Sequence, residues 1–319
     1  MEKLLEVKDL KVSFFTDLGE TQAVKGAGFA IGEGDFFGIV GESGSGKSVT
    51  TKSILRLGPS NCKIMGGKIL FRGEDILKKN EAELREIRGG EIAMIFQDSL
   101  SALNPVYTVG NKMVELIRRH TNMNKKEAKA RVLELLTAVG ITDPEKAMNS
   151  YPHELSGGMR QRVMIAMAMS SDPKVLIADE PTTALDVTIQ AQILHLLLEL
   201  QKKNNMSIIL ITHDLGVVAQ TCKRVAVMCG GYVVEEGTVE EIFLHPGHPY
   251  TQALIASMPR VGGTFEQFLE RDLSDGNGDL CPFLNRCKYA DKTCEACLPK
   301  YYEASEGHRI FCHRREEKR

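Results

Sequence analysis

The sequence has no hydrophobic run long enough to cross a membrane, because its longest uninterrupted apolar segment, residues 163–169, has only seven residues. A membrane-spanning helix needs about 20. The first ten residues, MEKLLEVKDL, also lack the apolar stretch and the small-residue cleavage site of a secretory signal. We therefore expect a cytoplasmic chain that reaches a membrane only through partner proteins.

The chain also lacks a large net charge. Its 40 Lys and Arg residues nearly balance its 42 Asp and Glu residues, which leaves a net charge of −2. A strongly basic chain would attract nucleic acid or anionic lipid over much of its surface. The near-neutral balance argues against such attraction, so we expect no nucleic-acid partner.

Strand-like and helix-like segments alternate up to about residue 260 of the 319, which is typical of an α/β fold. Three short segments near the start favour a small antiparallel sheet, and three apolar runs favour buried parallel strands. The former are 4–7, 11–15 and 68–71, and the latter are 36–40, 175–178 and 208–211. Helical apolar spacing at 109–120 and 125–139 predicts a helical insert that stops at Gly140.

The segment Gly41-Glu-Ser-Gly-Ser-Gly-Lys47-Ser48 matches the phosphate-loop pattern G-x-x-x-x-G-K-[ST]. It follows a predicted strand and precedes a helix-like segment, which is the context that this loop requires. Backbone N–H groups from Gly44 to Ser48 would cradle phosphates at the start of that helix. Lys47 would reach the β- and γ-phosphates, and the hydroxyl of Ser48 would bind Mg²⁺.

Two carboxylates, Asp179 and Glu180, directly follow the apolar strand at 175–178. Asp179 suits the coordination shell of Mg²⁺, and Glu180 would orient an attacking water and accept its proton. His213 follows another apolar strand, and we predict that it contacts the γ-phosphate or holds Glu180. A histidine after a strand is by itself more often an ordinary loop residue. The order of the segments therefore carries this prediction.

The segment Leu155-Ser156-Gly157-Gly158-Met-Arg-Gln-Arg162 precedes an apolar, helix-like run. Its serine and glycines expose backbone donors at a helix start, which fits a second anion site, and an ordinary N-cap fits the same residues. The segment resembles the LSGG signature of ATP-binding cassette ATPases. Other motifs of that family occur in the expected order over residues 1–260: GESGSGKS, MIFQDSLSALNP with Gln97, IADEPTTALD and ITHD.

The resemblance implies a P-loop NTPase fold of the ATP-binding cassette type, with a mixed central sheet, a small antiparallel β subdomain and a helical subdomain at about 97–162. Two such subunits would enclose two ATP molecules, each held by the phosphate loop of one subunit and the LSGG segment of the other. The residues implied for ATP within the chain are Phe14, which would stack on adenine, and Gly41, Glu42, Ser43, Gly44, Ser45, Gly46, Lys47, Ser48 and Val49. Those implied to reach the second ATP are Ser156, Gly157, Gly158 and Asp186. Those implied for Mg²⁺ are Ser48, Gln97 and Asp179, and those implied for catalysis are Glu180 and His213.

The segments HPGHPYTQALI at 245–255 and MPR at 258–260, with a tail that contains HRIFCH, resemble the ATPases of bacterial dipeptide and oligopeptide importers. This resemblance covers nearly the whole chain and implies a motor subunit that couples ATP hydrolysis to peptide uptake. Its partners would be a second, different ATPase subunit, two membrane permeases and, indirectly, a peptide-binding protein. Relatives that carry nickel or another small solute share the tail pattern, so the solute stays open. A capped surface helix is the simplest structural interpretation of HPYT.

Eight cysteines in a reducing compartment need an explanation other than disulfides. We interpret Cys62, Cys222 and Cys229 as buried or incidental, and the Gly-rich, acidic segment 261–280 as a linker. The remaining five lie in a tail at 281–319, at Cys281, Cys287, Cys294, Cys297 and Cys312. Their spacing fits neither a zinc ribbon of paired C-x-x-C motifs nor the cysteine run of bacterial ferredoxins.

Four thiolates can nevertheless close a tetrahedral site, and a metal would supply folding free energy to so short a tail. The resemblance to peptide importers implies a [4Fe–4S] cluster on four cysteines, with Zn²⁺ or unligated thiols as alternatives. The implied ligands are Cys281, Cys287, Cys294 and Cys312. Cys297 departs from the family pattern, and this thiol, His308 or His313 could replace one of the four.

Two functions of other classes stay open as alternatives. Cassette proteins that act on ribosomes or nucleic acid without transport usually carry two cassettes or a coiled-coil insertion, and neither is visible here. A zinc-dependent nucleic-acid module in the tail would need a basic face. Residues 281–319 carry nine Lys and Arg against six Asp and Glu, which is a small excess for that purpose.

Overall fold

The computed structural model describes residues 3–97, 102–183, 185–258 and 280–314, so the linker predicted at 261–280 lies outside it apart from Leu280. The described strands are β1 (Lys3–Thr16), β2 (Gly19–Gly32), β3 (Phe36–Val40), β4 (Cys62–Phe71), β5 (Glu74–Asp75), β6 (Ile92–Ile95), β7 (Val175–Asp179), β8 (Ser207–Thr212), β9 (Arg224–Cys229), β10 (Tyr232–Thr238), β11 (Tyr301–Ser305) and β12 (His308–Phe311). The described α-helices are α1 (Lys47–Ile54), α2 (Glu81–Ile87), α4 (Val109–His120), α5 (Lys125–Ala138), α6 (Pro144–Asn149), α7 (Gly157–Ala168), α8 (Val187–Asn204), α9 (Leu215–Thr221), α10 (Val239–Leu244), α11 (Pro249–Ala256) and α12 (Lys292–Ala296). Short 3₁₀ turns are η1 (Ile76–Lys78), η2 (Pro152–Glu154) and η3 (Leu284–Arg286).

The smaller sheet is antiparallel, as the sequence predicts, and has the strand order β2-β1-β4-β5. The segments predicted at 4–7 and 11–15 are parts of one strand, β1, whose register shifts between Val7 and Leu10. Odd-numbered residues such as Leu5 and Val7 are buried before the shift, and even-numbered residues such as Leu10 and Val12 are buried after it. A bulge changes which alternate residues face the core, and this change makes one strand look like two in the sequence.

The larger sheet has the order β11-β12-β10-β9-β3-β8-β7-β6. The three apolar runs predicted as buried parallel strands are β3, β7 and β8, and they pair in parallel. Ile39 lies beside Ile211 and Ile177 beside Ile209, all fully buried. Parallel strands end at the same edge of a sheet, so the polar segments that follow β3, β7 and β8 meet there.

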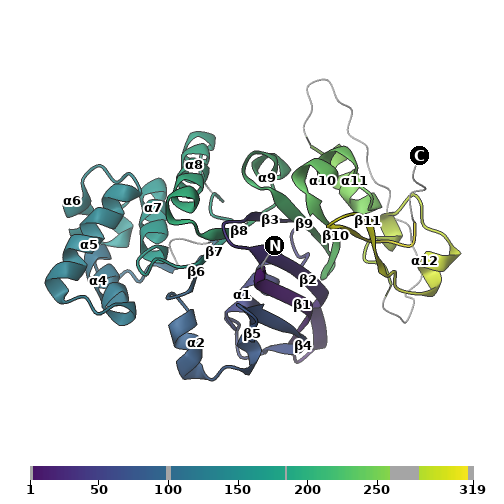
Figure 1. Cartoon of the computed structure of the whole chain (residues 1–319), viewed down its shortest axis with the longest axis horizontal. Helices are drawn as coiled ribbons and strands as arrows, with labels where there is room; N and C mark the ends of the chain where they lie inside the picture. The colour runs from purple at the N-terminus through teal and green to yellow at the C-terminus, as the bar shows by residue number, and fades with distance from the viewer. Residues whose placement is uncertain (1–2, 98–101, 184, 259–279, 315–319) are drawn as a thin grey trace.

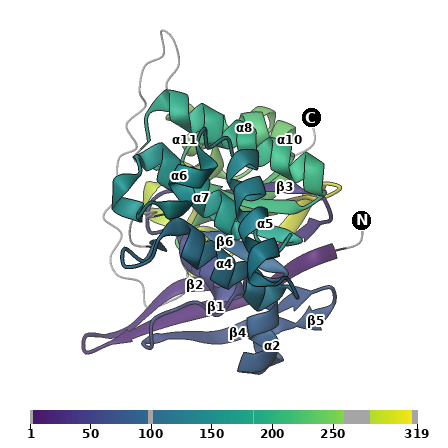
Figure 2. The same ribbon diagram turned by 90° about the vertical axis from the view of Figure 1, so that its left-hand side faces the viewer.

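The predicted helical insert is present, and α4 to α7 lie at the opposite end of the molecule from the tail strands (Figure 1, and facing the viewer in Figure 2). The side chains of Thr108 and Asn124 cap α4 and α5, and α5 ends before Gly140, whose φ of 75° suits a helix stop. Helix α7 continues from the signature segment to Ala168 without a break. No helix in the described ranges combines the length and apolar character of a membrane span.

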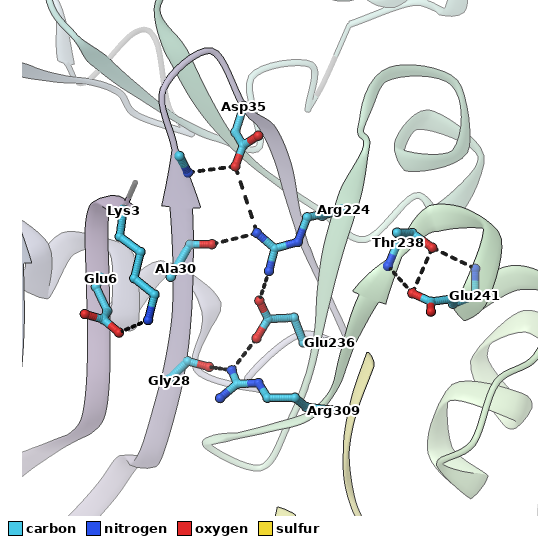
Figure 3. A network of polar contacts seen from close by, with 11 residues as sticks. Lys3, Glu6, Gly28, Ala30, Asp35, Arg224, Glu236, Thr238, Glu241 and Arg309 are labelled. Atoms are coloured by element: carbon cyan, nitrogen blue, oxygen red, sulfur yellow. Dashed lines mark hydrogen bonds and ion pairs between the residues drawn. The ribbon is translucent and has the colours of Figure 1, made fainter. Parts of the chain in front are cut away.

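Two strands of the C-terminal tail belong to the larger sheet. Strand β12 pairs antiparallel with β10, where Ile310 lies opposite Glu235, and β11 pairs with β12. Arg309 of β12 donates to the carbonyl oxygen of Gly28 over 3.0 Å and pairs with Glu236, which also binds Arg224 (Figure 3). The tail is therefore an edge of the sheet that carries the phosphate loop, and it is also joined to the smaller sheet.

Candidate nucleotide-binding and catalytic site

The phosphate loop joins β3 to α1, and two of its glycines are required by space as well as by backbone angle. Gly41 and Gly46 have φ angles of 149° and 98°. A Cβ atom on Gly41 would lie 2.1 Å from the carbonyl oxygen of Met228, and one on Gly46 would lie 2.7 Å from that of Ala23. These positions exclude any side chain, so the loop wraps closely around the start of α1.

Lys47 is buried and folds back over the loop that precedes it. Its Nζ donates to the carbonyl oxygens of Gly41 and Glu42, over 2.7 and 2.8 Å. Burial lowers the pKa of Lys47, while Glu180 and Asp179 act in the opposite direction. The ammonium group is thus held by the loop and is attracted by the two carboxylates after β7.

Ser48 and Asp179, predicted to share a magnesium ion, are in direct contact. The hydroxyl of Ser48 donates to Oδ1 of Asp179 over 2.7 Å. The other oxygen, Oδ2, is buried and has no hydrogen-bond partner among the described residues, although Nζ of Lys52 lies 3.8 Å away. Burial raises the pKa of Asp179. A serine hydroxyl beside an unsatisfied carboxylate oxygen is the kind of oxygen donor set that Mg²⁺ prefers.

Side chains from three loops, which follow β6, β7 and β8, contact the carboxylate of Glu180. Its Oε2 accepts hydrogen bonds from Nε2 of Gln97 and Oγ1 of Thr183, each over 2.9 Å. Nδ1 of His213 lies 3.5 Å from the other oxygen, Oε1. Three of the predicted site residues, Gln97, Glu180 and His213, therefore come together, and Thr183 is a contact that the sequence analysis missed.

Phe14 lies on β1 at the wall of a cavity of about 750 Å³. Ser48 and Val49 line the same cavity, which extends from α1 to β4. Cys62 of β4 lies opposite Phe14 in the strand register. The half-buried ring of Phe14 therefore faces open space next to the phosphate loop, at the place predicted for adenine.

The signature residues stand at the start of α7, close to the start of α8. The side chain of Ser156 caps α7 through the N–H of Met159, and that of Asp186 caps α8 through the N–H of Ile189. A Cβ atom on Gly158 would lie 3.0 Å from Cγ2 of the same Ile189. Among the described residues, no recorded hydrogen bond or ion pair joins Ser156, Gly157, Gly158 or Asp186 to the phosphate loop. The structure places these four residues together, in a group separate from the loop.

Two residues near the C-terminus contact the phosphate loop, and the sequence analysis missed both contacts. The hydroxyl of Tyr250 accepts a hydrogen bond from the N–H of Glu42 over 2.9 Å, and Arg286 binds the carboxylate of Glu42 through two nitrogens. Tyr250 belongs to HPYT, which forms the N-terminus of α11. His248 caps this helix, as expected, but Pro249 and Tyr250 are buried, so the helix start is not on the surface.

The four tail cysteines assigned as ligands line one small cavity of about 20 Å³. Burial, together with the neighbouring thiols of Cys312, Cys287 and Cys294, raises the pKa of Cys281 to about 12. Burial also raises the pKa of the Cys294 and Cys312 thiols. The four residues predicted as ligands therefore lie around one cavity. These raised pKa values favour the protonated thiols of Cys281, Cys294 and Cys312 unless a cation is bound.

A preformed metal site, however, is not supported. Across the described residues, no group of three or more His, Cys, Asp or Glu side chains is placed to hold a metal ion, and none of the eight cysteines forms a disulfide. Cys297 is exposed and lies outside the cavity wall, and His308 pairs with Glu235, so neither is a substitute ligand here. His313 does line the cavity, with its Nε2 next to the carbonyl oxygen of Cys297.

Comparison with protein families gives two matches. The model described as "ABC transporter" matches residues 24–183, and that described as "Oligopeptide/dipeptide transporter, C-terminal region" matches residues 234–294. The second match includes HPYT, Arg286 and three of the four cavity cysteines. The two family models therefore match separate parts of the chain.

Similar curated proteins cover nearly the whole chain. The dipeptide transport ATP-binding protein DppD of Bacillus subtilis is 49% identical over 98% of this chain and 95% of its own length. The oligopeptide transport ATP-binding protein OppD of the same organism is 51% identical over 97% and 88%, and DppD of Escherichia coli is 46% identical over 97% and 96%. Among solved structures, the dimeric ABC transporter cassette MJ0796 superposes with a TM-score of 0.67 at 29% identity, over 74% of this chain and 98% of that one. The chain thus belongs to the ATP-binding cassette family, in the group that carries the oligopeptide/dipeptide transporter C-terminal region.

Proposed function

We propose that this chain is the ATP-hydrolysing motor subunit of an importer that takes up dipeptides or oligopeptides through separate membrane subunits. The observation that carries the proposal is the contact of Gln97 and His213 with Glu180, next to the hydrogen bond between Ser48 and Asp179. Ser48 is the last residue of the phosphate-loop motif. Relatives that are 45–51% identical over nearly the full length are named as peptide transport ATP-binding proteins.

ATP would bind with its phosphates on the loop and on the N-terminus of α1. Lys47 would exchange its bonds to two loop carbonyl oxygens for the β- and γ-phosphate oxygens. Ser48, Asp179 and Gln97 would hold Mg²⁺, and the unsatisfied Oδ2 of Asp179 supports this donor set. The ion would neutralise the charge of the phosphates. Phe14 would stack on the adenine in the cavity that it shares with Val49.

Hydrolysis requires an oriented water and an acceptor for its proton. Glu180 suits this role because Gln97 and Thr183 fix one carboxylate oxygen and leave the other facing His213. His213, which is largely exposed, would contact the γ-phosphate and keep Glu180 in place. Removal of the γ-phosphate would then break the contacts that keep the site closed.

The second half of each ATP site would come from a second ATPase subunit. The group formed by Ser156, Gly157, Gly158 and Asp186 lies apart from this chain's own loop, and it presents two capped helix starts. Helix N-termini favour anions. We propose that this group binds the γ-phosphate of the ATP held by the partner, so that nucleotide binding closes the pair.

An apolar groove next to Gln97 suits the membrane permeases. A cavity of about 230 Å³ is lined by Phe96, Leu103, Leu116, Met164 and Met167. Phe96 is more than one third exposed and directly precedes Gln97, which contacts Glu180. A cytoplasmic segment of a permease bound in this groove would be displaced when the carboxylate of Glu180 moves. The subunit would then sit at the cytoplasmic face of the membrane without crossing it.

We further propose that the four cavity cysteines hold an iron–sulfur cluster, with Zn²⁺ as the alternative. Four thiols around one cavity match the usual Cys₄ ligand set of such clusters. Cluster ligands bind different iron atoms and need not converge on one point, whereas four ligands of a single Zn²⁺ must. The lack of a single-ion site among the described residues therefore argues more strongly against zinc than against a cluster.

The proposed function is tested with the chain co-purified with its partner ATPase and permeases, reconstituted in vesicles with the peptide-binding protein. We expect uptake of a labelled peptide. This uptake should require ATP on the side of the membrane that carries the ATPase subunits, and it should stop when Lys47 is replaced by alanine. Uptake of Ni²⁺ without uptake of peptide would contradict the peptide assignment but not the motor role. ATP hydrolysis unrelated to any solute would contradict the motor role.

A further inference from the structure

Glu42, the second residue of the phosphate loop, is held from two sides by residues more than 200 positions later in the chain. Nη1 and Nη2 of Arg286 lie 3.0 and 2.9 Å from Oε1 and Oε2 of Glu42, so the guanidinium binds the carboxylate end-on through two nitrogens. The hydroxyl of Tyr250 accepts from the N–H of Glu42 over 2.9 Å. Paired charge-assisted bonds of this kind fix orientation as well as distance.

The same peptide segment also positions the loop lysine. The carbonyl oxygen of Glu42 accepts from Nζ of Lys47 over 2.8 Å, and from the N–H of Ser45 over 3.2 Å. A movement of Glu42 therefore changes the position of Lys47 and the shape of the phosphate-binding turn. Arg286 and Tyr250 act on nucleotide binding through this residue rather than by contact with the nucleotide.

The loop at 281–287 that carries Arg286 is itself fixed on the protein. The buried ring of Phe283 meets the ring of Tyr250 edge-on at 5.4 Å, and the guanidinium of Arg286 lies 5.2 Å from the centre of the Phe283 ring. Pro282 packs so closely on Gly230 that a Cβ there would lie 2.6 Å from it. The loop begins and ends at Cys281 and Cys287, which line the thiol cavity.

We propose that Arg286 and Tyr250 are positioning residues of the nucleotide site, and that through them the C-terminal loop at 281–287 sets the affinity for MgATP. The inference rests on the proposed function, because MgATP is the ligand whose affinity it concerns. It assigns the C-terminal region a task inside the ATPase site, beyond any contact with the transporter. It also gives the thiol cavity a short physical connection to that site.

The direct test measures MgATP binding to the purified full chain by calorimetry. We expect Arg286→Gln to weaken binding about threefold to tenfold, because a half-exposed bidentate pair contributes a modest free energy. Tyr250→Phe removes the hydroxyl that receives the Glu42 N–H and should weaken binding similarly. Arg286→Lys keeps the charge with a single donor group and should recover part of the loss. Lys288→Gln, two residues further on and packed on Tyr289, is the matched control and should bind like the wild type.

A double-mutant cycle separates positioning from a general structural effect. If Arg286 acts through Glu42, the double variant Glu42→Gln/Arg286→Gln should bind MgATP no more weakly than the single variant with the lower affinity. The KM for ATP should rise in Arg286→Gln while kcat at saturating ATP stays within about twofold of the wild type. Hydrogen exchange of the peptide that covers residues 41–48 should also be faster in Arg286→Gln, whatever the effect on activity.

The outcomes are distinguishable. Wild-type affinity and wild-type loop exchange in Arg286→Gln, or fully additive effects in the cycle, would overturn the positioning role. A wild-type chain that binds no MgATP at all would instead overturn the proposed function. If Arg286→Gln shows no cooperative unfolding transition in a thermal melt, MgATP affinity and loop exchange are compared in Tyr250→Phe and Arg286→Lys instead.

Discussion

The side-chain amide of Gln97 donates a hydrogen bond to the carboxylate of Glu180 over 2.9 Å, although the two residues are 83 positions apart. Thr183 donates to the same oxygen, and His213 faces the other one. One oxygen is therefore fixed by two donors, while the other lies 3.5 Å from Nδ1 of His213. Gln97 also adjoins the apolar groove around Phe96, so one hydrogen bond connects the proposed permease contact to the carboxylate that we propose as the catalytic base.

Lys47→Ala should weaken MgATP binding by about tenfold or more, because it removes a charged donor that reaches from α1 into the phosphate loop. The fold should also lose some stability, since the carbonyl oxygens of Gly41 and Glu42 lose a buried partner. Calorimetric titration with MgATP measures the first effect. Lys126→Ala, on the exposed face of α5, is the control and should leave binding unchanged. Tight binding by the Lys47 variant would remove the phosphate-loop assignment.

The sequence was sufficient to predict the parts of the site that depend on short-range order. The phosphate loop, the buried parallel strands and the carboxylates after β7 all follow from local patterns, and the rule that parallel strands end at one edge brings them together. Ser48 and Asp179 could be paired for this reason, although 131 positions separate them. The helices α4 and α5 were equally clear, because their apolar spacing and caps are local.

Contacts between the C-terminal tail and the core could not be predicted in this way. Nothing in the pattern around Arg286 indicates a partner 244 positions earlier, since an arginine beside a cysteine fits many surroundings. Strands β11 and β12 were also missed, because their residues alternate weakly and β12 is joined to the sheet by pairing with β10, which is distant in the sequence.

Metal analysis of the tail should give iron and sulfide rather than zinc. Protein purified without oxygen should be brown, with broad absorbance in the visible range, and the colour should be lost in Cys287→Ser. Cys297→Ser is the matched control and should keep the colour, because Cys297 does not line the cavity. Colourless protein with one zinc per chain would contradict the cluster proposal. Metal-free protein would contradict both the iron–sulfur proposal and the zinc alternative.

The pair formed by His308 and Glu235 should make the attachment of the tail depend on pH. Burial lowers the pKa of His308, but the hydrogen bond and charge of Glu235, with Glu241 nearby, outweigh it and raise the pKa above 6.5. The charged form is therefore favoured in the folded state. Its contribution to stability is complete below about pH 6.5 and is lost as the pH rises through the higher folded-state pKa.

His308→Gln should accordingly lower Tm more at pH 6 than at pH 9, with a difference of about 2–4 °C between the two losses. Thermal melts of the wild type and the variant across this range measure it. His195→Gln, which removes an exposed histidine beside Glu199 on α8, is the control and should show no such trend. Parallel Tm curves for wild type and His308→Gln would show that the pair does not titrate as described.

The most direct test of the account compares ATP turnover and ATP binding in Glu180→Gln, using the chain co-purified with its partner ATPase and permeases. The glutamine keeps the shape of the side chain and can still accept from Gln97, but it cannot take a proton from water. We expect turnover to fall about 10²- to 10⁴-fold, MgATP affinity to stay within about twofold, and an ATP-bound closed pair of ATPase subunits to accumulate. Glu199→Gln, on the exposed face of α8, should match the wild type. Turnover in Glu180→Gln close to that of the wild type would contradict the assignment of Glu180 as the catalytic base.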